Sequence, residues 1–361
     1  RYDLEAGDRV LIDTGEYPLS APVRIDLLDG GTAANPVVIQ GSTNDAGTAF
    51  AGAGIQFDNA RGIVVRNVKF TAQTSLGNVA TVSSSEDVAL EQFDIFGAPA
   101  GGVKITTCSN VVLRNFTVAH ALTNGIMSYA SFNTRLEFGT IWSNGLAQIV
   151  ARNQLIEAPR PEREASFVTV SNCILGAYGL RIPAFEVRGN LYANFNDFYL
   201  ANGALAALSY LTGFGREFDT VGGWASSEYG QDGMSLSHNP RFANAGADDF
   251  HLKSTTGRWV SAAAGWTNDV ESSPLIDAAD PTLDFSAETI PNGGRANVGR
   301  YGNTAQASRT PTNGALTLIS FNDGGRASGA AVPILWNARG DITNGTVSIY
   351  YSADGGSNWT T

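Results

Sequence analysis

The sequence predicts an all-β protein, a β-solenoid followed by short antiparallel strands, and three observations support this fold class. Two short motifs return in the same order about every 23 residues through the first half of the 361-residue chain, as from Gly102 to Gly125. Each motif alternates apolar and polar side chains, which is the period of a strand. The chain contains 41 glycines and is only 16% charged, a composition typical of many short strands joined by tight turns.

Each repeat is expected to form one coil. In the first motif, Val103 and Ile105 alternate with Lys104 and Thr106. In the second motif, residues 111–118, the alternation changes phase at an asparagine. A strand, a bend and a second strand in each unit would close one coil of a parallel β-solenoid, with every strand bonded to the coils above and below.

The second motif predicts columns of equivalent side chains along the solenoid axis. Two columns are aliphatic or aromatic and are expected in the core: Val65, Leu90, Leu113, Leu136, Val170 and Phe70, Ile95, Val118, Ile141, Leu175. A third column, at the bend, is expected to form an amide ladder whose members bond to the next coil and to local backbone, because Asn tolerates left-handed bends: Asn67, Gln92, Asn115, Asn172, with Phe138 as the exception.

A fourth column carries charges of alternating sign: Arg66, Glu91, Arg114 and Glu137. Strands stack about 4.8 Å apart, so opposite charges would face each other and contribute about 0.2–1 kcal/mol per pair. The column can be interpreted as a binding strip for acidic sugars or as a solvated ladder that fixes the register. The alternation of sign favours the ladder.

Charge and composition limit the function classes. The formal net charge is −11 and the pI is near 4.7. Such a surface repels duplex nucleic acid and anionic membranes. No stretch approaches 18 apolar residues, so no transmembrane segment is expected. The two cysteines, Cys108 and Cys173, fall at different positions of the repeat, which predicts two buried free thiols.

Two segments break the period. Residues 152–164 form a polar insertion that is expected to bulge outward, where recognition loops usually lie. Residues 203–229 are rich in aromatic side chains. Of these, Tyr210, Trp224 and Tyr229 are the candidate substrate-binding residues, because they could stack on sugar rings. The alternative is that they pack over the open end of a coil.

Several motifs resemble those of secreted right-handed parallel β-helix proteins of the pectin-lyase-like class, found in large bacterial surface proteins. The opening run Tyr2–Tyr17 is similar to their first coil, and Asn196–Leu200 to their "NDYYL" coil. Ser273–Pro281 and Pro291–Thr304 resemble their "SPAIDAGDP" and "PNGGRxNxGAYGGT" segments. The resemblance implies a right-handed parallel β-helix with a C-terminal cap over residues 1–308, in an extracellular protein that is secreted or attached to a cell surface.

The last residues differ in pattern. After a linker at 309–315, residues 316–361 contain three segments that read as antiparallel strands and look like the first half of an immunoglobulin-like β-sandwich: Leu316–Phe321, Pro333–Ala338 and Val347–Ser352. Ser352–Trp359 fits the Asp-box hairpin, a folding element in which the Trp tucks under the turn. An incomplete sandwich cannot close its core, so the polypeptide is expected to continue beyond Thr361.

The sequence offers few candidates for catalysis. A polysaccharide lyase needs a Lys or Arg base, and a hydrolase needs paired carboxylates. Asp94 is expected to point outward with Lys69, Thr117 and Thr140 in its column, which supplies no second carboxylate. The candidate catalytic residues are therefore the cations Lys104, Arg114 and Arg152, with Ala80, Met127 and Gln148 expected near Lys104.

Metal and cofactor motifs are absent from the sequence. His120, His238 and His251 have no ligand spacing, and His251 is interpreted as a structural residue of the cap. No metal site and no cofactor are expected. No motif indicates calcium, although structural calcium is left open.

The first hypothesis is a non-catalytic, extracellular β-helix module of a larger protein, with a structural or adhesive role and contact with a glycan. Its partners would be a glycan or another cell-surface protein, together with further domains of the same polypeptide. The alternative is a polysaccharide lyase, hydrolase or epimerase acting on an extracellular glycan. A third hypothesis is a virion tailspike, which would form tight trimers.

Overall fold

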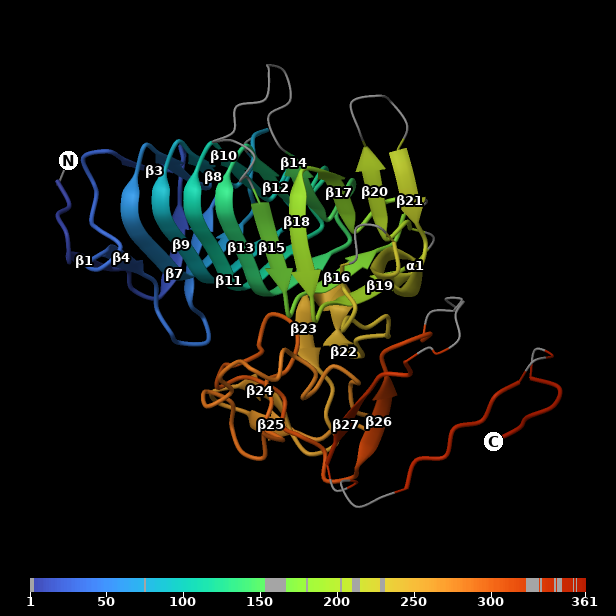
Figure 1. The fold of residues 1–361 in the computed structure, drawn as a ribbon. Coiled ribbons are helices and arrows are strands. Elements are labelled where there is room, and N and C mark those ends of the chain that lie inside the picture. Colours follow the sequence, from blue (N-terminus) through green and yellow to red (C-terminus); the bar gives the residue numbers. More distant parts are fainter. Residues whose placement is uncertain are drawn as a thin grey trace.

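The computed structural model describes residues 3–74, 76–152, 167–179, 181–201, 203–209, 215–227, 231–322, 331, 333–340, 342, 346–352, 354 and 356–361. Within them the chain forms a parallel β-helix, and a C-terminal cap packs against one side of it (Figure 1). The predicted all-β class and parallel β-helix are confirmed.

Two long sheets form the β-helix. The first, with 12 strands in the described residues, is ordered β1 (Arg9–Leu11), β4 (Val37–Gln40), β7 (Arg61–Thr71), β9 (Glu86–Phe96), β11 (Ser109–Ala119), β13 (Phe132–Trp142), β15 (Phe167–Ser171) and β18 (Asn190–Asn194), with β2 (Gly15–Pro18), β5 (Thr48–Ala51), β16 (Ile174–Ala177) and β19 (Asp197–Leu200) beside this path. The second, with nine, is ordered β3 (Val23–Asp26), β6 (Ile55–Asp58), β8 (Ala80–Ser83), β10 (Val103–Thr106), β12 (Ile126–Tyr129), β14 (Ile149–Arg152), β17 (Phe185–Arg188), β20 (Ala206–Ser209) and β21 (Gly215–Phe218).

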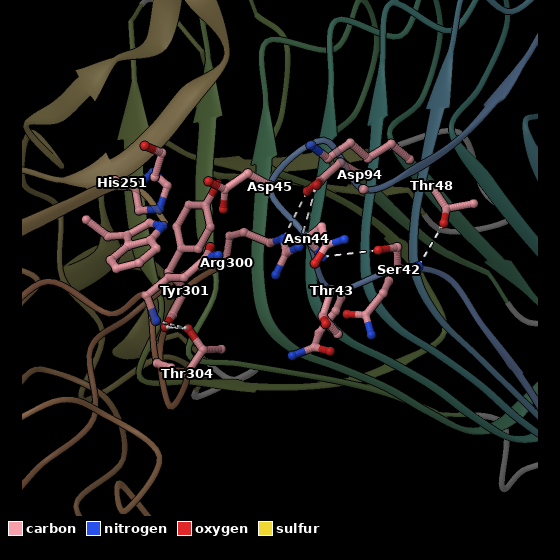
Figure 2. A pocket seen from close by; sticks show the side chains of 18 of the residues that line it. Ser42, Thr43, Asn44, Asp45, Thr48, Asp94, His251, Arg300, Tyr301 and Thr304 are labelled. Carbon is pink, nitrogen blue, oxygen red and sulfur yellow. Dashed lines mark hydrogen bonds and ion pairs between the residues drawn. The ribbon is translucent and has the colours of Figure 1, made fainter. Parts of the chain in front are cut away.

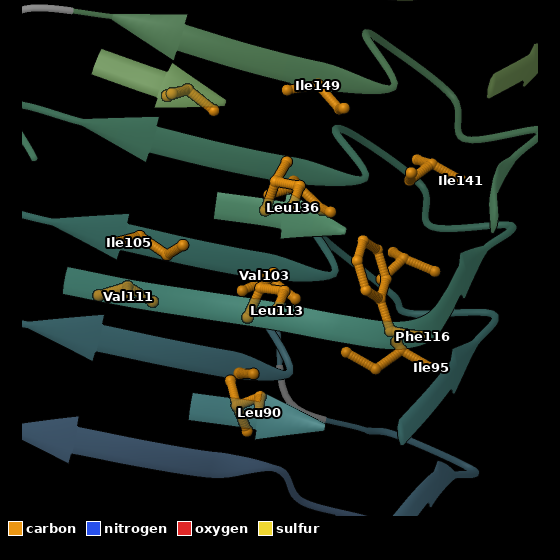
Figure 3. Packing of buried hydrophobic residues seen from close by; sticks show 14 of the residues in the cluster. Leu90, Ile95, Val103, Ile105, Val111, Leu113, Phe116, Leu136, Ile141 and Ile149 are labelled. Atoms are coloured by element: carbon orange, nitrogen blue, oxygen red, sulfur yellow. The ribbon is translucent and has the colours of Figure 1, made fainter. Parts of the chain in front are cut away.

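The core columns follow the predicted register. Leu90 pairs with Leu113 and Leu113 with Leu136, and Ile95, Val118 and Ile141 follow one another in the same way. Figure 3 shows the three leucines, with Ile95 and Ile141, stacked inside the coils. All members of both predicted apolar columns are fully buried. A parallel solenoid therefore buries the same positions in every coil, which is why its period is readable in sequence.

The long strands bend at the predicted amide column. Its members adopt left-handed backbone conformations, with φ of 57° at Asn67, 52° at Gln92 and Asn115, 53° at Phe138 and 56° at Asn172. A second left-handed column, not anticipated from the sequence, joins its side chains directly. Asn110 Nδ2 donates to Asp87 Oδ1 (2.9 Å), and Asn133 Nδ2 donates to Asn110 Oδ1 (2.9 Å). Asn and Asp suit both roles because they tolerate positive φ.

Both cysteines are buried and free, as predicted. The Cys108 thiol takes a place in a ladder with two serines: Ser85 N–H donates to Cys108 Sγ (3.5 Å), and Cys108 N–H donates to Ser131 Oγ (3.1 Å). Cys173 Sγ accepts from Gly139 N–H (3.3 Å) at the bend. Burial raises the pKa of Cys173 to about 12. Both thiols therefore serve as backbone acceptors within the coils.

The last coil is closed by a hairpin and a short helix. Strand β21 pairs antiparallel with β20, and α1 (Val221–Ala225) follows with Thr220 as its N-cap. Trp224 on this helix is 1% exposed, and its indole donates to Asp232 Oδ2 (2.9 Å). This arrangement covers the end of the core with an aromatic ring whose polar atom is satisfied.

The cap comprises β22 (Phe242–Asn244), the 3₁₀ turn η2 (Ala245–Ala247), β23 (Asp249–Leu252), β24 (Arg258–Ser261), β25 (Gly265–Thr267) and the irregular segment that follows to about residue 310. It packs against the outer surface of the second halves of β9, β11 and β13 and against β16. A second hydrophobic core lies there, built around Trp142, Phe242 and Phe250. Trp142 needs the adjacent Gly176, because a Cβ at that position would lie 2.1 Å from its ring.

The C-terminal residues form a smaller antiparallel pair, β26 (Ala315–Leu318) with β27 (Trp336–Arg339), compatible with part of a sandwich. The expectation of a third strand at Val347–Ser352 was wrong. Residues 347–350 are not in a strand, and Tyr351 makes only an isolated β-bridge to Thr360. Asp354 Oδ1 accepts from Asn358 N–H (2.8 Å), as the Asp-box turn requires. The Trp359 indole donates to the Gly356 carbonyl of the turn (3.1 Å), while its ring stays 62% exposed. The proposed boundaries at 308 and 316 stay a prediction.

Candidate functional site

A groove of about 570 Å³ lies where the cap meets the first coils of the β-helix (Figure 2). One side is formed by the loop before β5 and by the bends of β7 and β9. The other side is formed by β23, the β24–β25 hairpin and residues 300–306. The lining residues are Ser42, Thr43, Asn44, Asp45, Gly47, Thr48, Asn67, Val68, Lys69, Gln92, Asp94, His251, Trp259, Val260, Ser261, Arg300, Tyr301, Thr304, Ala305 and Gln306.

The solenoid side of the groove follows from the coil register. Lys69 pairs with Asp94 across β7 and β9, and both side chains point away from the core because they alternate with buried Val68, Phe93 and neighbouring core residues. The left-handed bends just before them turn the strand direction. Each bend therefore presents an amide, Asn67 or Gln92, and the charged side chain two positions later, Lys69 or Asp94, to the same groove.

A buried ion pair forms the base of the groove. Arg300 Nε lies 2.9 Å from Asp94 Oδ1, and each side chain is only 11% exposed. Burial alone would raise the pKa of Asp94. The charge of Arg300, hydrogen bonds from Arg300 and Thr117, and the charge of Lys69 together hold that pKa below its usual value. Asp94 is therefore ionised at neutral pH, and its charge is directed at Arg300.

The bend column fixes the segment that carries Arg300. Asn115 Nδ2 donates to the carbonyls of Arg300 (3.1 Å) and Gly302 (2.8 Å), and Asn172 Oδ1 accepts from Asp280 N–H (2.7 Å). The expectation that these amides bond to the next coil was wrong for these two residues. Their side chains point out of the coil, where the cap supplies backbone partners.

A histidine–tyrosine stack forms the cap side. The rings of His251 and Tyr301 are 3.6 Å apart at 11°, and His251 Nδ1 lies 2.7 Å from Asp249 Oδ1. Because an ionised carboxylate only accepts, Nδ1 carries the proton. Burial would raise the pKa of Asp249, but the hydrogen bonds and charge of His251 and the charge of Arg258 lower it. Burial raises the pKa of Tyr301, so its hydroxyl stays protonated.

The remaining wall joins the loop before β5 to the β24–β25 hairpin of the cap. Asp45 Oδ2 accepts from Ala262 N–H (2.6 Å), which ties the loop before β5 to the β24–β25 hairpin. Ser42 Oγ accepts from Thr14 Oγ1 (2.7 Å), and Ser42 N–H donates to Thr48 Oγ1 (2.8 Å), so the loop is held to the first coil. Trp259 lines the groove from the hairpin and packs edge-on against Trp266.

The three candidate catalytic cations do not line this groove. Lys104 lies on the second sheet, where its strand partners are Thr81 and Met127. The expectation of Ala80 was wrong by one position, because Ala80 pairs with Val103. The expectation of Gln148 was wrong by two positions, because Val150 pairs with Met127. Arg114 contacts Glu137 (2.7 Å) and Glu91 (3.7 Å). Arg152 is paired with Glu186. The structure brings neither arginine into a site with Lys104, and the carboxylates beside each arginine compensate its charge.

Of the candidate sugar-binding aromatics, Tyr210 and Tyr229 lie outside the described residues. Trp224 is 1% exposed, so in this structure its ring has no free face for a sugar, because it packs over the coil end. The two period breaks therefore contribute no described residue to the groove.

Sequence reasoning missed the partner of Asp94. Arg300 lies 206 positions away in the chain, and no repeat or spacing links the two residues. The only signal was the cap motif Pro291–Thr304, which was recognised as a resemblance and contains Arg300 and Tyr301.

No group of three or more His, Cys, Asp or Glu side chains that could hold a metal gathers among the residues that the structure describes. Over the same residues, no helix has the length and apolar character needed to cross a bilayer.

No protein-family model and no curated protein matches the chain. Similar solved structures include an alginate lyase from Paenibacillus sp. str. FPU-7 (14% identity, 56% of this chain and 84% of that chain, TM-score 0.41). Others are the PL6 family alginate lyase AlyGC (10% identity, 54% and 32%, TM-score 0.38) and pectate lyase Pel9A (11% identity, 82% and 88%, TM-score 0.37). The chain thus spans about a third of AlyGC. These likenesses are too distant to assign an activity, a substrate or site residues.

Proposed function

We propose that this protein is an extracellular β-helix module that binds a glycan in the groove between the first coils and the cap, without cleaving it. The lining of the groove carries this proposal. Hydroxyl and amide side chains surround a space beside two aromatic rings, Trp259 and Tyr301. Sugars offer hydroxyls for the polar groups and C–H faces for the rings, so this mixture matches their chemistry.

The ionised groups of the groove support binding rather than cleavage. A hydrolase needs two carboxylates free to act as acid and base or nucleophile. Here Asp94 is occupied by Arg300, and Asp45 accepts a backbone hydrogen bond from the hairpin. Each carboxylate therefore has a structural partner that catalysis would have to displace.

The extracellular, structural or adhesive setting remains part of the proposal. It is supported by the resemblance of the coil and cap motifs to secreted and cell-surface β-helix proteins. A glycan held beside the cap would attach such a module to a polysaccharide or to a glycosylated surface.

The test is incubation of the purified protein with a panel of polysaccharides, with binding and cleavage measured on the same samples. We expect retention by at least one immobilised polymer and no release of reducing or unsaturated ends. Release of such ends would favour the alternative of a lyase or hydrolase, and a change in uronate stereochemistry measured by NMR would favour an epimerase. The variant Lys104→Ala separates the sites, because the groove proposal expects it to bind normally.

A further inference from the structure

We infer that the groove selects a neutral, hydroxyl-rich glycan over a uronate polymer. The inference rests on the proposed function and adds the class of ligand. Its first support is charge balance. Besides His251, the lining contains two basic residues, Lys69 and Arg300, and two acidic residues, Asp45 and Asp94. A site for polyanions concentrates unpaired positive charge, and these four formal charges cancel.

Two of the three guanidinium nitrogens of Arg300 are committed to Asp94. Its Nε and Nη2 both face Asp94, at 2.9 and 3.5 Å, and its main-chain N–H donates to Thr140 Oγ1 (3.2 Å). The guanidinium also lies 5.2 Å from the Tyr301 ring centre. Turning it toward a ligand would leave Asp94 buried without its partner, which is costly in a site this enclosed.

Lys69 is the second cation of the lining. It is the register neighbour of Asp94, and its charge contributes to the lowered pKa of Asp94. Its ammonium also lies along the loop before β5, 3.9 Å from where a Cβ on Gly47 would stand. Asp94 is paired with Arg300, so Asp45 supplies the second negative charge of the lining and balances Lys69 in number.

The uncharged lining is suited to hydroxyl groups. Apart from the ionic groups and the rings, it consists mainly of hydroxyl and amide side chains that both donate and accept: Ser42, Thr43, Asn44, Thr48, Asn67, Gln92, Ser261, Thr304 and Gln306. His251 also lines the groove, but its ring is held by the protein. Its Nε2 is buried and has no hydrogen-bond partner, while Nδ1 is committed to Asp249. The lining therefore offers donors and acceptors without net charge, which matches the hydroxyl groups of a neutral sugar.

The experiment compares immobilised neutral polymers (β-glucan, galactan and mannan) with uronate polymers (polygalacturonate and alginate), at 50 and 500 mM NaCl. We expect retention on a neutral polymer, with an affinity that changes less than about twofold across this salt range. Trp259→Ala and Gln306→Ala should each weaken binding, the first by about tenfold or more. Lys69→Gln should change it less than about threefold. Trp359→Ala, which removes an exposed Trp far from the groove in sequence, is the matched control.

The outcomes separate the two proposals. Binding to uronates alone, weakened by salt and by Lys69→Gln, would overturn the neutral-glycan inference and leave the glycan-binding function standing. Failure of the folded protein to bind any polymer would overturn both. Equal losses for Trp259→Ala and Trp359→Ala would show that the groove is not the site. Gln306→Ala keeps the test valid if Trp259→Ala does not fold, since Gln306 packs no ring.

Discussion

The two halves of the long strands β7, β9, β11 and β13 have the same register and opposite surroundings. In the first half, outward residues such as Arg114 are solvated. In the second half, outward residues are covered by the cap: Asp94 is 7% exposed, Thr117 1% and Thr140 0%. The repeat sets where each side chain points. A non-repeating segment decides whether that side chain meets water or a second core.

The groove lies where this cover ends. Along the outward column the exposure rises from buried Thr140 and Thr117, through Asp94, to half-buried Lys69. The first coils reach beyond the cap, and the loop before β5 meets the hairpin tip through Asp45. The site is therefore formed where the β-helix extends beyond the cap, rather than by any one repeat.

The largest effect is expected for Trp142→Ala. Trp142 points outward from β13 yet is 3% exposed, and its ring contacts those of Tyr199, Phe242 and Phe250. Removing a buried Trp costs about 3–5 kcal/mol through lost burial and the cavity that remains. Urea unfolding followed by circular dichroism would measure the loss. If the variant were as stable as Trp359→Ala, whose ring is exposed, the cap would not form a second core.

A loss of about 3 kcal/mol is expected for Asp94→Asn, because it leaves Arg300 buried without a counter-charge. The double variant Asp94→Asn/Arg300→Met should recover much of this loss, since it removes both charges together. Unfolding free energies of the two single variants and the double variant form the necessary cycle. Additive losses in the double variant would contradict a coupled pair.

The fold was predictable because every coil of a solenoid has the same pattern of buried and exposed positions. Each coil buries the same positions, so Leu90, Leu113 and Leu136 reveal the core by period alone. The site was not predictable for the same reason. Its decisive contact joins Asp94 of a repeat to Arg300 of a non-repeating cap, and the repeat pattern predicted only that Asp94 points outward. Sequence spacing carries no information on such a contact. It forms when the cap docks through the second hydrophobic core and through hydrogen bonds from Asn115 and Asn172.

The cap should become less stable as the pH rises. Burial raises the pKa of Asp277 from 3.8 to about 6 and that of Glu288 from 4.5 to about 8. The folded state therefore keeps these protons to a higher pH than the unfolded state, so stability is full below the ordinary pKa values and falls between about pH 4 and pH 8. We expect a loss of at least about 2 kcal/mol between pH 5 and pH 8.5.

Denaturant midpoints across this pH range would measure the effect, and Glu288→Gln provides the control. In the parent protein Glu288 Oε1 accepts hydrogen bonds from the N–H groups of Asn297 and Asn303, each at 2.8 Å. A Gln side chain can still accept these bonds but cannot ionise. The pH profile of this variant should be flatter than that of the parent protein. A profile as steep as the parent's would show that Glu288 is not responsible. Asp94 acts in the opposite direction, but only at low pH, because its pKa is lowered.

The smallest effect is expected for Arg114→Ala, which is the uncovered counterpart of Asp94→Asn. Arg114 lies on β11, one of the same four long strands, and also contacts a carboxylate, that of Glu137, at 2.7 Å. Its side chain, however, is 41% exposed. Water screens the pair and solvates Glu137 when Arg114 is lost, so the change should stay below about 1 kcal/mol and shrink further at high salt. A loss as large as that of Asp94→Asn would mean that position in the coil, rather than cover by the cap, sets the strength of an ion pair.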